Sequence, residues 1–435
     1  MQNKLKILII GAGGGREHAL GWKIAQSGRA GELFFARGNA GTAQIGTNLD
    51  IKETDTSALS NFAKEEKIDI TLVASDDALA AGVVDEFRQA GLKIWGPTKI
   101  ASKLEWSKAF AKDFMQRHDL PTAKFRVFNN FEKANEYLKE QPLPIVVKAD
   151  GLALGKGVVI CHSVEEAYGA LENIMVKKIF ADSGNTVVIE EFLVGPEISI
   201  HALSDGKNYD IFPPSQDHKR IGENDMGPNT AGMGTIAPLP FVDEEIMKKI
   251  DKDIIAPTLE AMRKEGTPFE GILYPSLMLT KDGPKIIEFN ARFGDPEAQT
   301  YMRLLDTDLL DIIEACVDKK LNKTKIKWKN SFACNIALAS GGYPGNYIKG
   351  KIISGIEEVK LQKDIIIFHA NTKVEGEKLV TSGGRVLGIS SVGDTLVEAL
   401  AKAYKAIEKI SFEGMQYRKD IGKSALDLEK TNYPN

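Results

Sequence analysis

The sequence predicts a multidomain protein of the α/β and α+β classes. The chain has 435 residues, enough for two to four folding units at about 150 residues each. Apolar runs alternate with helical patterns near the N-terminus, which is typical of a parallel sheet. From about residue 328, glycine pairs separate short apolar runs of β type. We therefore expect an N-terminal domain at 1–103, a two-lobed central domain at 104–327 with a flap at about 122–191, and a small α+β domain at 328–435.

The composition excludes several classes of protein. Hydrophobic residues make up 43% and charged residues 27% of the chain, as in ordinary globular proteins. The net charge is -4 and no long basic run occurs, so we expect no nucleic-acid partner. No apolar stretch approaches the ~18 residues of a membrane span, and the first residues enter a strand directly, so we expect no membrane anchor and no signal peptide.

The cysteines indicate a reducing compartment. Cys161, Cys316 and Cys334 are odd in number and lack CxxC spacing, which argues against structural zinc. We expect a cytoplasmic protein that is a monomer or a weak dimer.

The N-terminal unit begins with a strand, a glycine-rich turn and a helix. An apolar run at 5–10 leads into glycines at 11 and 13–15, and a helix begins at Arg16. This Rossmann-like unit can accommodate a phosphate at the helix N-terminus. Binding of NAD is disfavoured, because the third glycine of GxGxxG would fall at Arg16 and the next strand, 32–36, ends at Arg37 rather than at an acidic residue.

Two further strand ends carry polar loops. Residues 38–42 follow the strand at 32–36, and Ser75, Asp76 and Asp77 follow a strand at 70–73. Neighbouring parallel strands end at the same edge of a sheet, so we expect the three loops to share one crevice. The unit closes near residue 100.

The next segment predicts a helix over 99–118 that carries Lys108, a helix over 131–139, and strands over 144–149 and 158–161. The glycine-rich connection at 150–157 contains Lys156 and predicts a flap over phosphates. It is not a Walker A loop, because the G-K-[ST] ending and the following helix are absent. Lys148 lies on the strand below; it is either a surface lysine or, given its apolar neighbours, the partner of an anion.

An apolar run at 187–191 ends in Glu190 and Glu191. It predicts either a hinge whose backbone faces an adenine or a strand that ends in solvated acids, with equal weight. Residues 216–234 predict a long polar, glycine-rich loop, which is usually functional or disordered. His218 in that loop receives no role as a base, because no Ser or Cys nucleophile motif is nearby.

The segment 285–297 carries the strongest chemical signal. Side chains alternate along a strand, so Glu288, Asn290 and Arg292 should point the same way. Carboxylate and amide oxygens suit Mg²⁺, and an adjacent arginine can bind the same phosphates. A solvated edge strand is the general alternative, but the turn at 294–297 and the upstream lysines favour a metal–nucleotide site.

The remaining elements follow from periodicity. Helices are predicted over 243–264, 300–319 and 394–407, and strands over 271–280, 331–339, 365–370 and 386–391. We expect the C-terminal domain to close the active-site cleft.

The order of these residues resembles the ATP-grasp enzymes, in which two α+β lobes hold ATP between them. Further motifs resemble the phosphoribosylamine–glycine ligase family along essentially the whole chain. They are Gly13-Gly-Gly-Arg-Glu-His-Ala-Leu20, Gly38-Asn-Ala-Gly-Thr42, Lys148-Ala-Asp-Gly-Leu152, Gln216-Asp-His-Lys-Arg220, Gly227-Pro-Asn-Thr230, Glu288-Phe-Asn through Asp295-Pro-Glu297, Thr381-Ser-Gly-Gly-Arg385 and Phe412-Glu-Gly-Met-Gln-Tyr-Arg-Lys-Asp420.

The resemblance implies that ATP, glycine and 5-phosphoribosylamine give glycinamide ribonucleotide, ADP and phosphate through a glycyl phosphate, in purine biosynthesis. Metal ligands would be Glu288 and Asn290, holding Mg²⁺ or Mn²⁺. Catalytic candidates are Arg292, Lys156 and Asp217. ATP would contact Lys108, Lys148, Gly155, Lys156, Gly157, Glu190, Glu191, Leu193 and Glu197. The two other substrates would contact Gly13, Gly14, Gly15, Asn39, Ala40, Gly41, Thr42, Asp76, Asp217, Asn229 and Asp295.

Three departures from the family pattern lie in the N-terminal unit. The first loop has one additional glycine, Arg37 stands where proline is expected, and Ala74-Ser75-Asp76-Asp77 replaces a Gly-Pro-Glu motif. Asp76 could substitute for the glutamate. These changes leave ATP and metal binding untouched and bear on the amine substrate. The alternatives are an ATP-grasp ligase with another amine or carboxylate, and a nucleotide-binding regulatory protein without turnover.

Overall fold

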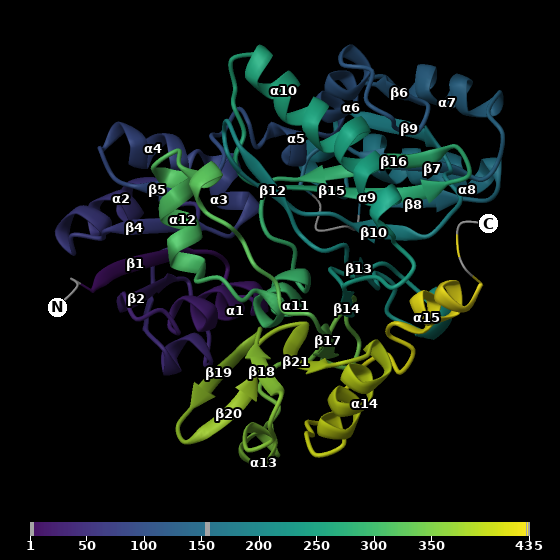
Figure 1. The fold of residues 1–435 in the computed structure, drawn as a ribbon. Coiled ribbons are helices and arrows are strands. Elements are labelled where there is room, and N and C mark those ends of the chain that lie inside the picture. Colours follow the sequence, from purple (N-terminus) through teal and green to yellow (C-terminus); the bar gives the residue numbers. More distant parts are fainter. Residues whose placement is uncertain (1–3, 153–156, 432, 434–435) are drawn as a thin grey trace.

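A computed structural model describes residues 4–152, 157–431 and 433. The N-terminal unit lies on one side, the two central lobes lie at the top, and a sheet with the C-terminal helices lies below them (Figure 1). In the described residues no helix is long and apolar enough to cross a membrane.

The N-terminal sheet is parallel, as predicted, with strand order β3-β2-β1-β4-β5. Residues 7–10 of its central strand are all apolar and buried, as expected for a strand covered by helices on both faces. The sequence interpretation missed β3. The elements are β1 (Leu5–Ile10), α1 (Gly15–Ile24), β2 (Ala30–Ala36), β3 (Thr47–Leu49), α2 (Thr56–Glu65), β4 (Ile70–Val73), α3 (Asp76–Ala81), α4 (Val83–Gln89) and β5 (Ile94–Trp95).

The helix predicted over 99–118 is wrong in one respect, because the structure divides it into α5 (Lys103–Trp106) and α6 (Lys108–Arg117). Ser107 between them has an extended backbone, and its hydroxyl accepts the N–H of Phe110 at 3.2 Å. A serine that caps a new helix competes with continuation of the old one. Lys108 is therefore the first residue of α6.

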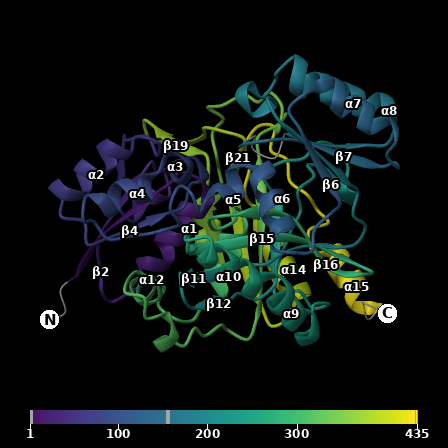
Figure 2. The ribbon, with the colours of Figure 1, turned by 90° about the horizontal axis from the view of Figure 1, so that it is seen from above.

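The first central lobe is the flap region. Its antiparallel sheet has the order β6-β9-β7-β8 and is covered by two helices. Figure 2 shows this lobe at the end of the molecule opposite the N-terminal unit. Its elements are β6 (Phe125–Phe128), α7 (Phe131–Lys139), β7 (Ile145–Ala149), β8 (Val158–Cys161), α8 (Val164–Leu171) and β9 (Val187–Glu191).

The second lobe is built on an antiparallel sheet of order β10-β15-β11-β12, with β16 on the other edge of β15. The strand that carries Glu288 ends at Asn290, so Arg292 lies just beyond it and not within it as expected. The elements are β10 (Glu197–Ser199), β11 (Ala202–Asp205), β12 (Tyr209–Ile211), α9 (Glu244–Ile250), α10 (Ala256–Lys264), β15 (Glu270–Thr280) and β16 (Gly283–Asn290).

The helix predicted over 300–319 is also wrong in its extent. The structure contains α11 (Glu297–Leu304) and α12 (Leu309–Val317), separated where Leu305 is extended and Asp308 caps the second helix. All eight residues of α11 are buried. This helix contacts α1 of the N-terminal unit and strands of the lower sheet, so it lies where the three parts of the molecule meet (Figure 1).

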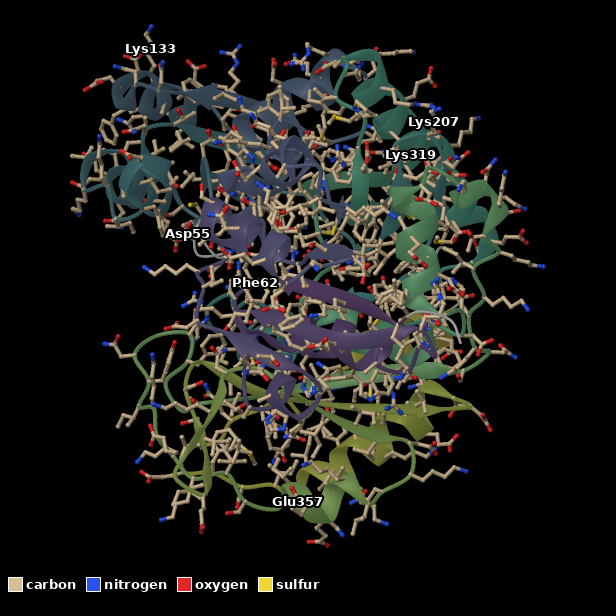
Figure 3. The ribbon with its side chains drawn as sticks, turned by 90° about the vertical axis from the view of Figure 1, so that its left-hand side faces the viewer. Asp55, Phe62, Lys133, Lys207, Lys319 and Glu357 are labelled. Carbon is tan, nitrogen blue, oxygen red and sulfur yellow. The ribbon has the colours of Figure 1, made fainter. Side chains whose placement is uncertain are left out.

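A fourth sheet has the order β13-β14-β17-β21-β18 and includes two strands from before residue 328. A side view separates Lys133 of the flap lobe from Glu357 of α13, with Phe62 of α2 between them (Figure 3). The remaining elements are β13 (Gln216–Asp217), β14 (Gly234–Ala237), β17 (Phe332–Ala339), α13 (Ile356–Lys360), β18 (Ile365–His369), β19 (Thr372–Glu375), β20 (Lys378–Thr381), β21 (Arg385–Gly393), α14 (Leu396–Ile407) and α15 (Lys423–Lys430).

Candidate active site

The polar groups at the end of β16 lie together. Arg292 donates to the amide oxygen of Asn290 at 3.0 Å, and Lys219 lies 3.9 Å from the Glu288 carboxylate. Burial alone would raise the pKa of Glu288, but Lys219, Lys148 and Lys108 lower it below its usual value. Glu288 is therefore ionised at neutral pH and faces a group of cations.

Arg292 is held by a carboxylate from another element. Its guanidinium lies 2.7 Å from Glu105 of α5, which also accepts the N–H of Ala291 at 2.9 Å. Burial raises the pKa of Glu105 to about 7, although Arg292 opposes the shift. The Nε atom of Arg292 is buried and has no hydrogen-bond partner within the described chain. The arginine thus retains a free donor beside the metal candidates.

Two buried lysines share one glutamate below the flap. Glu190 lies 3.0 Å from Lys148 and 3.2 Å from Lys112, and its other oxygen is buried without a partner among the described residues. Burial lowers the pKa of Lys112 to about 8. These residues line a recess together with Glu105, Lys108 and Glu288. Three lysines and three glutamates therefore line the recess, with Lys112 and Lys148 on either side of Glu190.

Lys108 contacts the base of the glycine-rich flap. Its ammonium donates to the carbonyl of Gly151 at 2.9 Å, while Asp150 accepts the N–H of Ala109 at 3.1 Å. The carbonyl of Gly157 accepts the N–H of Ala149 at the other end of the flap. Gly155 and Lys156, both predicted to contact ATP, lie outside the described residues.

The predicted adenine segment runs beside these lysines. Glu191 accepts the N–H of Lys124 at 2.9 Å, so its carboxylate is engaged within the protein. Leu193 is half-buried. Glu197 forms an ion pair with Lys219 and accepts the hydroxyl of Ser276 at 2.7 Å.

A second acidic group surrounds Asp217. Burial raises the pKa of Asp217 well above its usual value, and the neighbouring carboxylate of Glu297 adds to the shift. Glu297 accepts hydrogen bonds from Tyr274 at 2.6 Å and from Ser199 at 3.1 Å. A half-buried carboxylate, Asp217, thus lies beside the buried carboxylate of Glu297.

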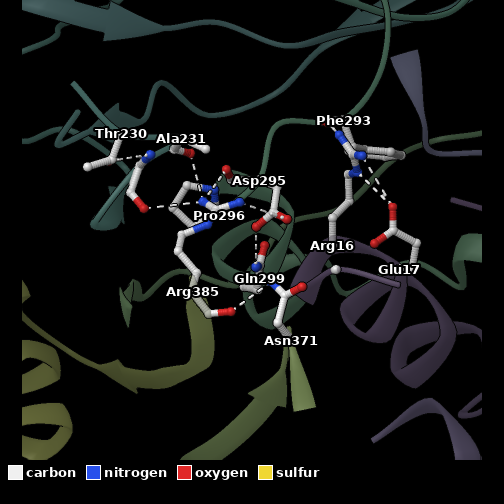
Figure 4. Close-up of polar contacts among 12 residues, drawn as sticks. Arg16, Glu17, Thr230, Ala231, Phe293, Asp295, Pro296, Gln299, Asn371 and Arg385 are labelled. Atoms are coloured by element: carbon white, nitrogen blue, oxygen red, sulfur yellow. Dashed lines mark hydrogen bonds and ion pairs between the residues drawn. The ribbon is translucent and has the colours of Figure 1, made fainter. Parts of the chain in front are cut away.

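Asp295 is held by the C-terminal sheet. Arg385 of β21 lies 3.1 Å from its carboxylate and donates to its backbone carbonyl at 2.7 Å (Figure 4). The same guanidinium donates to the carbonyls of Ala231 and Gly232. Asn229, two residues before Ala231, is half-buried and forms a β-bridge with Arg220. The predicted polar loop is thus tied to the site at Ala231 and Gly232, whereas residues 223–228 are exposed to solvent.

The first two N-terminal loops meet, as expected. The Asn39 side chain donates to the carbonyls of Gly13 at 3.0 Å, Gly14 at 3.2 Å and His369 at 2.8 Å. Its oxygen accepts the N–H groups of Gly41 and Thr42. All polar atoms of this side chain are therefore engaged within the protein, and Asn39 shapes the two loops. Gly15 begins α1, and Ala40 is buried.

The third loop lies beside the Glu105–Arg292 pair. Asp76 is half-buried and raises the pKa of both Glu105 and Arg292, so it lies close to this pair. Arg37 forms a bidentate ion pair with Glu53, at 2.9 Å for the shortest contact. The charge of Arg37, which stands where proline was expected, is thus neutralised by the carboxylate of Glu53.

Several residues of the site were missing from the predicted set. Lys112 could have been found, because it lies one helical turn after Lys108. Glu297 and Arg385 belong to quoted motifs but received no role. Glu105 carried no local signal, because only folding brings it to Arg292. Lys219 was noted only as part of a polar run.

Comparisons with known proteins agree along the chain. Sequence profiles match at residues 5–105 (phosphoribosylglycinamide synthetase, N domain), 106–298 (its ATP-grasp (A) domain) and 333–424 (its C domain). A phosphoribosylamine–glycine ligase from Caldanaerobacter subterraneus subsp. tengcongensis is 48% identical over 96% of this chain and 99% of its own length. One from Vibrio parahaemolyticus is 47% identical over 98% and 100%.

Solved structures agree with the fold. The phosphoribosylamine–glycine ligase of Thermotoga maritima superimposes with a TM-score of 0.84 at 35% identity, covering 96% of this chain and all of the other. A biotin carboxylase from Campylobacter jejuni shares the fold with a TM-score of 0.72 at 16% identity, covering 98% and 94%. The predicted ATP-grasp architecture with an N-terminal parallel sheet is confirmed.

Proposed function

Since this chain belongs to the phosphoribosylamine–glycine ligase family, we propose that it ligates glycine to 5-phosphoribosylamine with ATP, giving glycinamide ribonucleotide, ADP and phosphate. The step belongs to purine biosynthesis. Two bonds must form in sequence: a glycine carboxylate oxygen takes the γ-phosphoryl group, and the amine nitrogen then displaces phosphate from the glycyl phosphate. Such chemistry requires positioning and charge neutralisation more than a nucleophile on the protein.

One observation carries the proposal. Glu288, Asn290 and Arg292 lie beside the lysine recess. Lys219 is close to both Glu288 and Asp217, and Arg292 is close to Asp295. A polyanion bound with its metal ion would lie in the recess, where Lys108, Lys112 and Lys148 supply the cationic contacts beside Glu288. The reacting carboxylate would lie near Arg292, whose free Nε donor is available to a developing negative charge.

The residues fit a divalent cation. Glu288 is ionised, Asn290 offers an amide oxygen on the same side, and both are hard ligands of the kind that Mg²⁺ or Mn²⁺ takes. The described residues contain no group of three or more His, Cys, Asp or Glu that could hold a metal ion, so most ligands would come from phosphates and water. When bound, the ion would offset phosphate charge and orient the transferred phosphoryl group.

We assign the ammonium group of glycine to Asp217 and Glu297. The raised pKa of Asp217 reflects burial beside a second carboxylate, and a bound ammonium ion would relieve that repulsion. Because glycine is small, its carboxylate would then lie toward Arg292. Asn229 and Asp295 complete the surroundings.

The sugar phosphate is assigned to the first two N-terminal loops, where the N-terminus of α1 favours an anion. Asn39 would act by holding the loops in place. Asp76 would accept a sugar hydroxyl from the third loop. Arg37, paired with Glu53, lies at the edge of this region.

The test is ADP release in the presence of Mg-ATP, glycine and freshly generated phosphoribosylamine, with each component omitted in turn. We expect release only when all three are present. Release that needs glycine but ignores the amine would favour an ATP-grasp ligase with another nucleophile. No release in any mixture, with ATP still bound, would favour a regulatory protein.

We further propose a cytoplasmic location, because the three cysteines are buried and free, and a monomer or weak dimer, which sedimentation would test. The domain limits 1–103, 104–327 and 328–435 remain proposals. We expect limited proteolysis to cut near them, although β13 and β14 tie the last unit to the central one.

A further inference from the structure

Glu105 lies where three elements of the molecule meet. It belongs to α5, the short helix that follows the N-terminal sheet, and α5 packs against α3, α6 and β16. Through this packing its carboxylate reaches Ala291, which lies 186 positions later in the chain. The side chain of Glu105 therefore connects the end of the N-terminal unit to the strand that carries the metal candidates.

The carboxylate makes two contacts just beyond the end of β16. One oxygen lies 2.7 Å from the guanidinium of Arg292, and the other accepts the N–H of Ala291 at 2.9 Å. The ladder between β15 and β16 ends at the pair of Tyr274 and Asn290, so the N–H of the buried Ala291 lies beyond it. A buried N–H group needs a partner, and Glu105 supplies it. One side chain thus fixes both the backbone and the arginine at this point.

The donors of Arg292 are divided between Glu105 and the metal site. Its Nη2 atom contacts Glu105 at 2.7 Å and the amide oxygen of Asn290 at 3.0 Å. Its Nη1 atom donates to the carbonyl of Phe293 at 3.4 Å, which is a long and weak hydrogen bond. The side chain of Arg292 is 16% exposed and that of Glu105 is 6% exposed. The arginine is therefore the member of the pair that a ligand can reach.

The neighbouring carboxylates keep this arginine charged. Burial would lower the pKa of Arg292, but Glu105 and then Asp76 raise it above its usual value. Asp76 is the first residue of α3, so the two carboxylates come from helices that pack against each other. The position and the charge of the guanidinium thus both depend on Glu105.

The proposed reaction needs a cation that is held in one place. A phosphoryl group passes to a glycine carboxylate oxygen, and the amine then displaces phosphate from the same carbon. A displacement of about 1 Å in a group that positions the reactants can cost about 100-fold in rate. Without Glu105, the Nη2 atom of Arg292 would keep its contact with Asn290 alone, and the guanidinium could move.

We propose that Glu105 is a positioning residue for this reaction: by holding Arg292 and the N–H of Ala291 together, it sets where the guanidinium lies beside Glu288 and Asn290. Glu105 acts through Arg292 and not on a substrate. The inference rests on the proposed function, because it requires Arg292 to act on the reacting groups.

The first experiment compares Glu105→Gln with the wild type. Glutamine keeps the size of the side chain, but its amide has one acceptor oxygen and one donor nitrogen, so it can satisfy Arg292 or Ala291 but not both. We expect kcat for ADP release to fall by about 10- to 100-fold, with the KM values for ATP and glycine within about threefold of the wild type. Glu65→Gln, on the exposed surface of α2, is the matched control and should match the wild type.

A double-mutant cycle separates positioning from a general effect on the fold. Arg292→Met removes the group through which Glu105 acts, so adding Glu105→Gln to it should lower kcat by less than about threefold further. A residue that only stabilises the fold would lower kcat by the same factor in both proteins. If Glu105→Gln fails to fold, Glu105→Asp takes its place in the cycle, because aspartate keeps the charge beside Arg292.

Three outcomes would overturn the proposal: a kcat for Glu105→Gln within threefold of the wild type, a rise in a KM value with kcat unchanged, or equal losses of kcat with and without Arg292→Met. Failure of the proposed function is a separate result, because the wild-type enzyme itself would then release no ADP with the three substrates.

Discussion

Arg385 and Asp295 form a two-point contact between β21 and the turn after β16. The guanidinium lies 3.1 Å from the carboxylate and 2.7 Å from the backbone carbonyl of the same residue. Both side chains are 14% exposed, so the pair is largely shielded from water. Through this contact the C-terminal sheet forms one wall of the active site and sets the charge of Asp295.

We expect Arg385→Met to lower kcat/KM for glycine or the amine by about 10- to 100-fold. The substitution leaves a buried carboxylate without its partner, which costs about 1–3 kcal/mol. The KM for ATP should stay within threefold, because Arg385 does not contact the lysine recess. Steady-state kinetics with each substrate varied in turn makes the measurement.

Arg385→Lys is the matched variant. Lysine keeps the charge but cannot span the four acceptors that the planar guanidinium contacts. We therefore expect Arg385→Lys to regain only part of the kcat/KM that Arg385→Met loses. Equal activity of the methionine variant and the wild type would show that the contact has no role in catalysis.

Glu288→Gln should reduce Mg²⁺-dependent turnover by at least about 100-fold, because the amide lacks the charge that holds a divalent ion. Circular dichroism should show an intact fold. Asp282→Asn, in the exposed turn before β16, is the control. Turnover like that of the wild type at every Mg²⁺ concentration would remove Glu288 from the metal site.

Asp76→Ala should raise the KM for phosphoribosylamine without changing the KM for ATP. Asp76 is the first residue of α3, just after β4, in the loop assigned to the sugar, and it replaces an expected glutamate. The restoring variant is Asp76→Glu. An unchanged KM for the amine in the alanine variant would exclude Asp76 from the substrate site.

Lys112→Met should raise the KM for ATP by roughly 5- to 100-fold, the equivalent of about 1–3 kcal/mol for a lost charged contact. The residual pair of Lys148 and Glu190 keeps the fold intact. Lys133→Met, on the exposed helix α7, is the matched control. ATP binding by calorimetry checks the result, and an affinity equal to that of the control would contradict the assignment.

Buried histidines should make stability depend on pH. Burial lowers the pKa of His18 to about 3 and those of His218 and His369 to about 4. An unfolded histidine has a pKa of about 6.5, so between about pH 4 and 6.5 the unfolded chain binds more protons at each of these histidines than the folded chain does. The stability that each neutral, buried histidine contributes is therefore complete above pH 6.5 and is lost as the pH falls through this window. Carboxyl groups with raised pKa, such as Glu105, act in the opposite direction.

The comparison of His369→Asn with the wild type isolates one of these groups. Asparagine retains a partner for Thr372, which lies 3.0 Å from His369 Nδ1. We expect the slope of the free energy of unfolding against pH to decrease by about 1.4 kcal/mol per pH unit in this window. Urea unfolding between pH 4.5 and 6.5 measures it; identical slopes would show that His369 titrates normally.

Local patterns predicted the elements well where one signal dominated. The buried run in β1, the helix α7 and the β15–β16 pair follow from apolar periodicity and turn residues within a few positions. Two long helices were wrong, because Ser107 and Asp308 cap new helices inside segments whose periodicity continues. A side-chain bond to the backbone outweighs periodicity there.

The residues of the active site fall into two groups: those that local sequence patterns predict, and those that only the folded chain brings together. The sequence by itself determined the family motifs, the alternation of Glu288 and Asn290, and the lysines of the central segment, because each depends on residues close together in the chain. Only the tertiary structure decided that Glu105 holds Arg292 and that Arg385 holds Asp295. Burial and the neighbouring charges set the protonation of these carboxylates, and both arise when segments far apart in the sequence pack together.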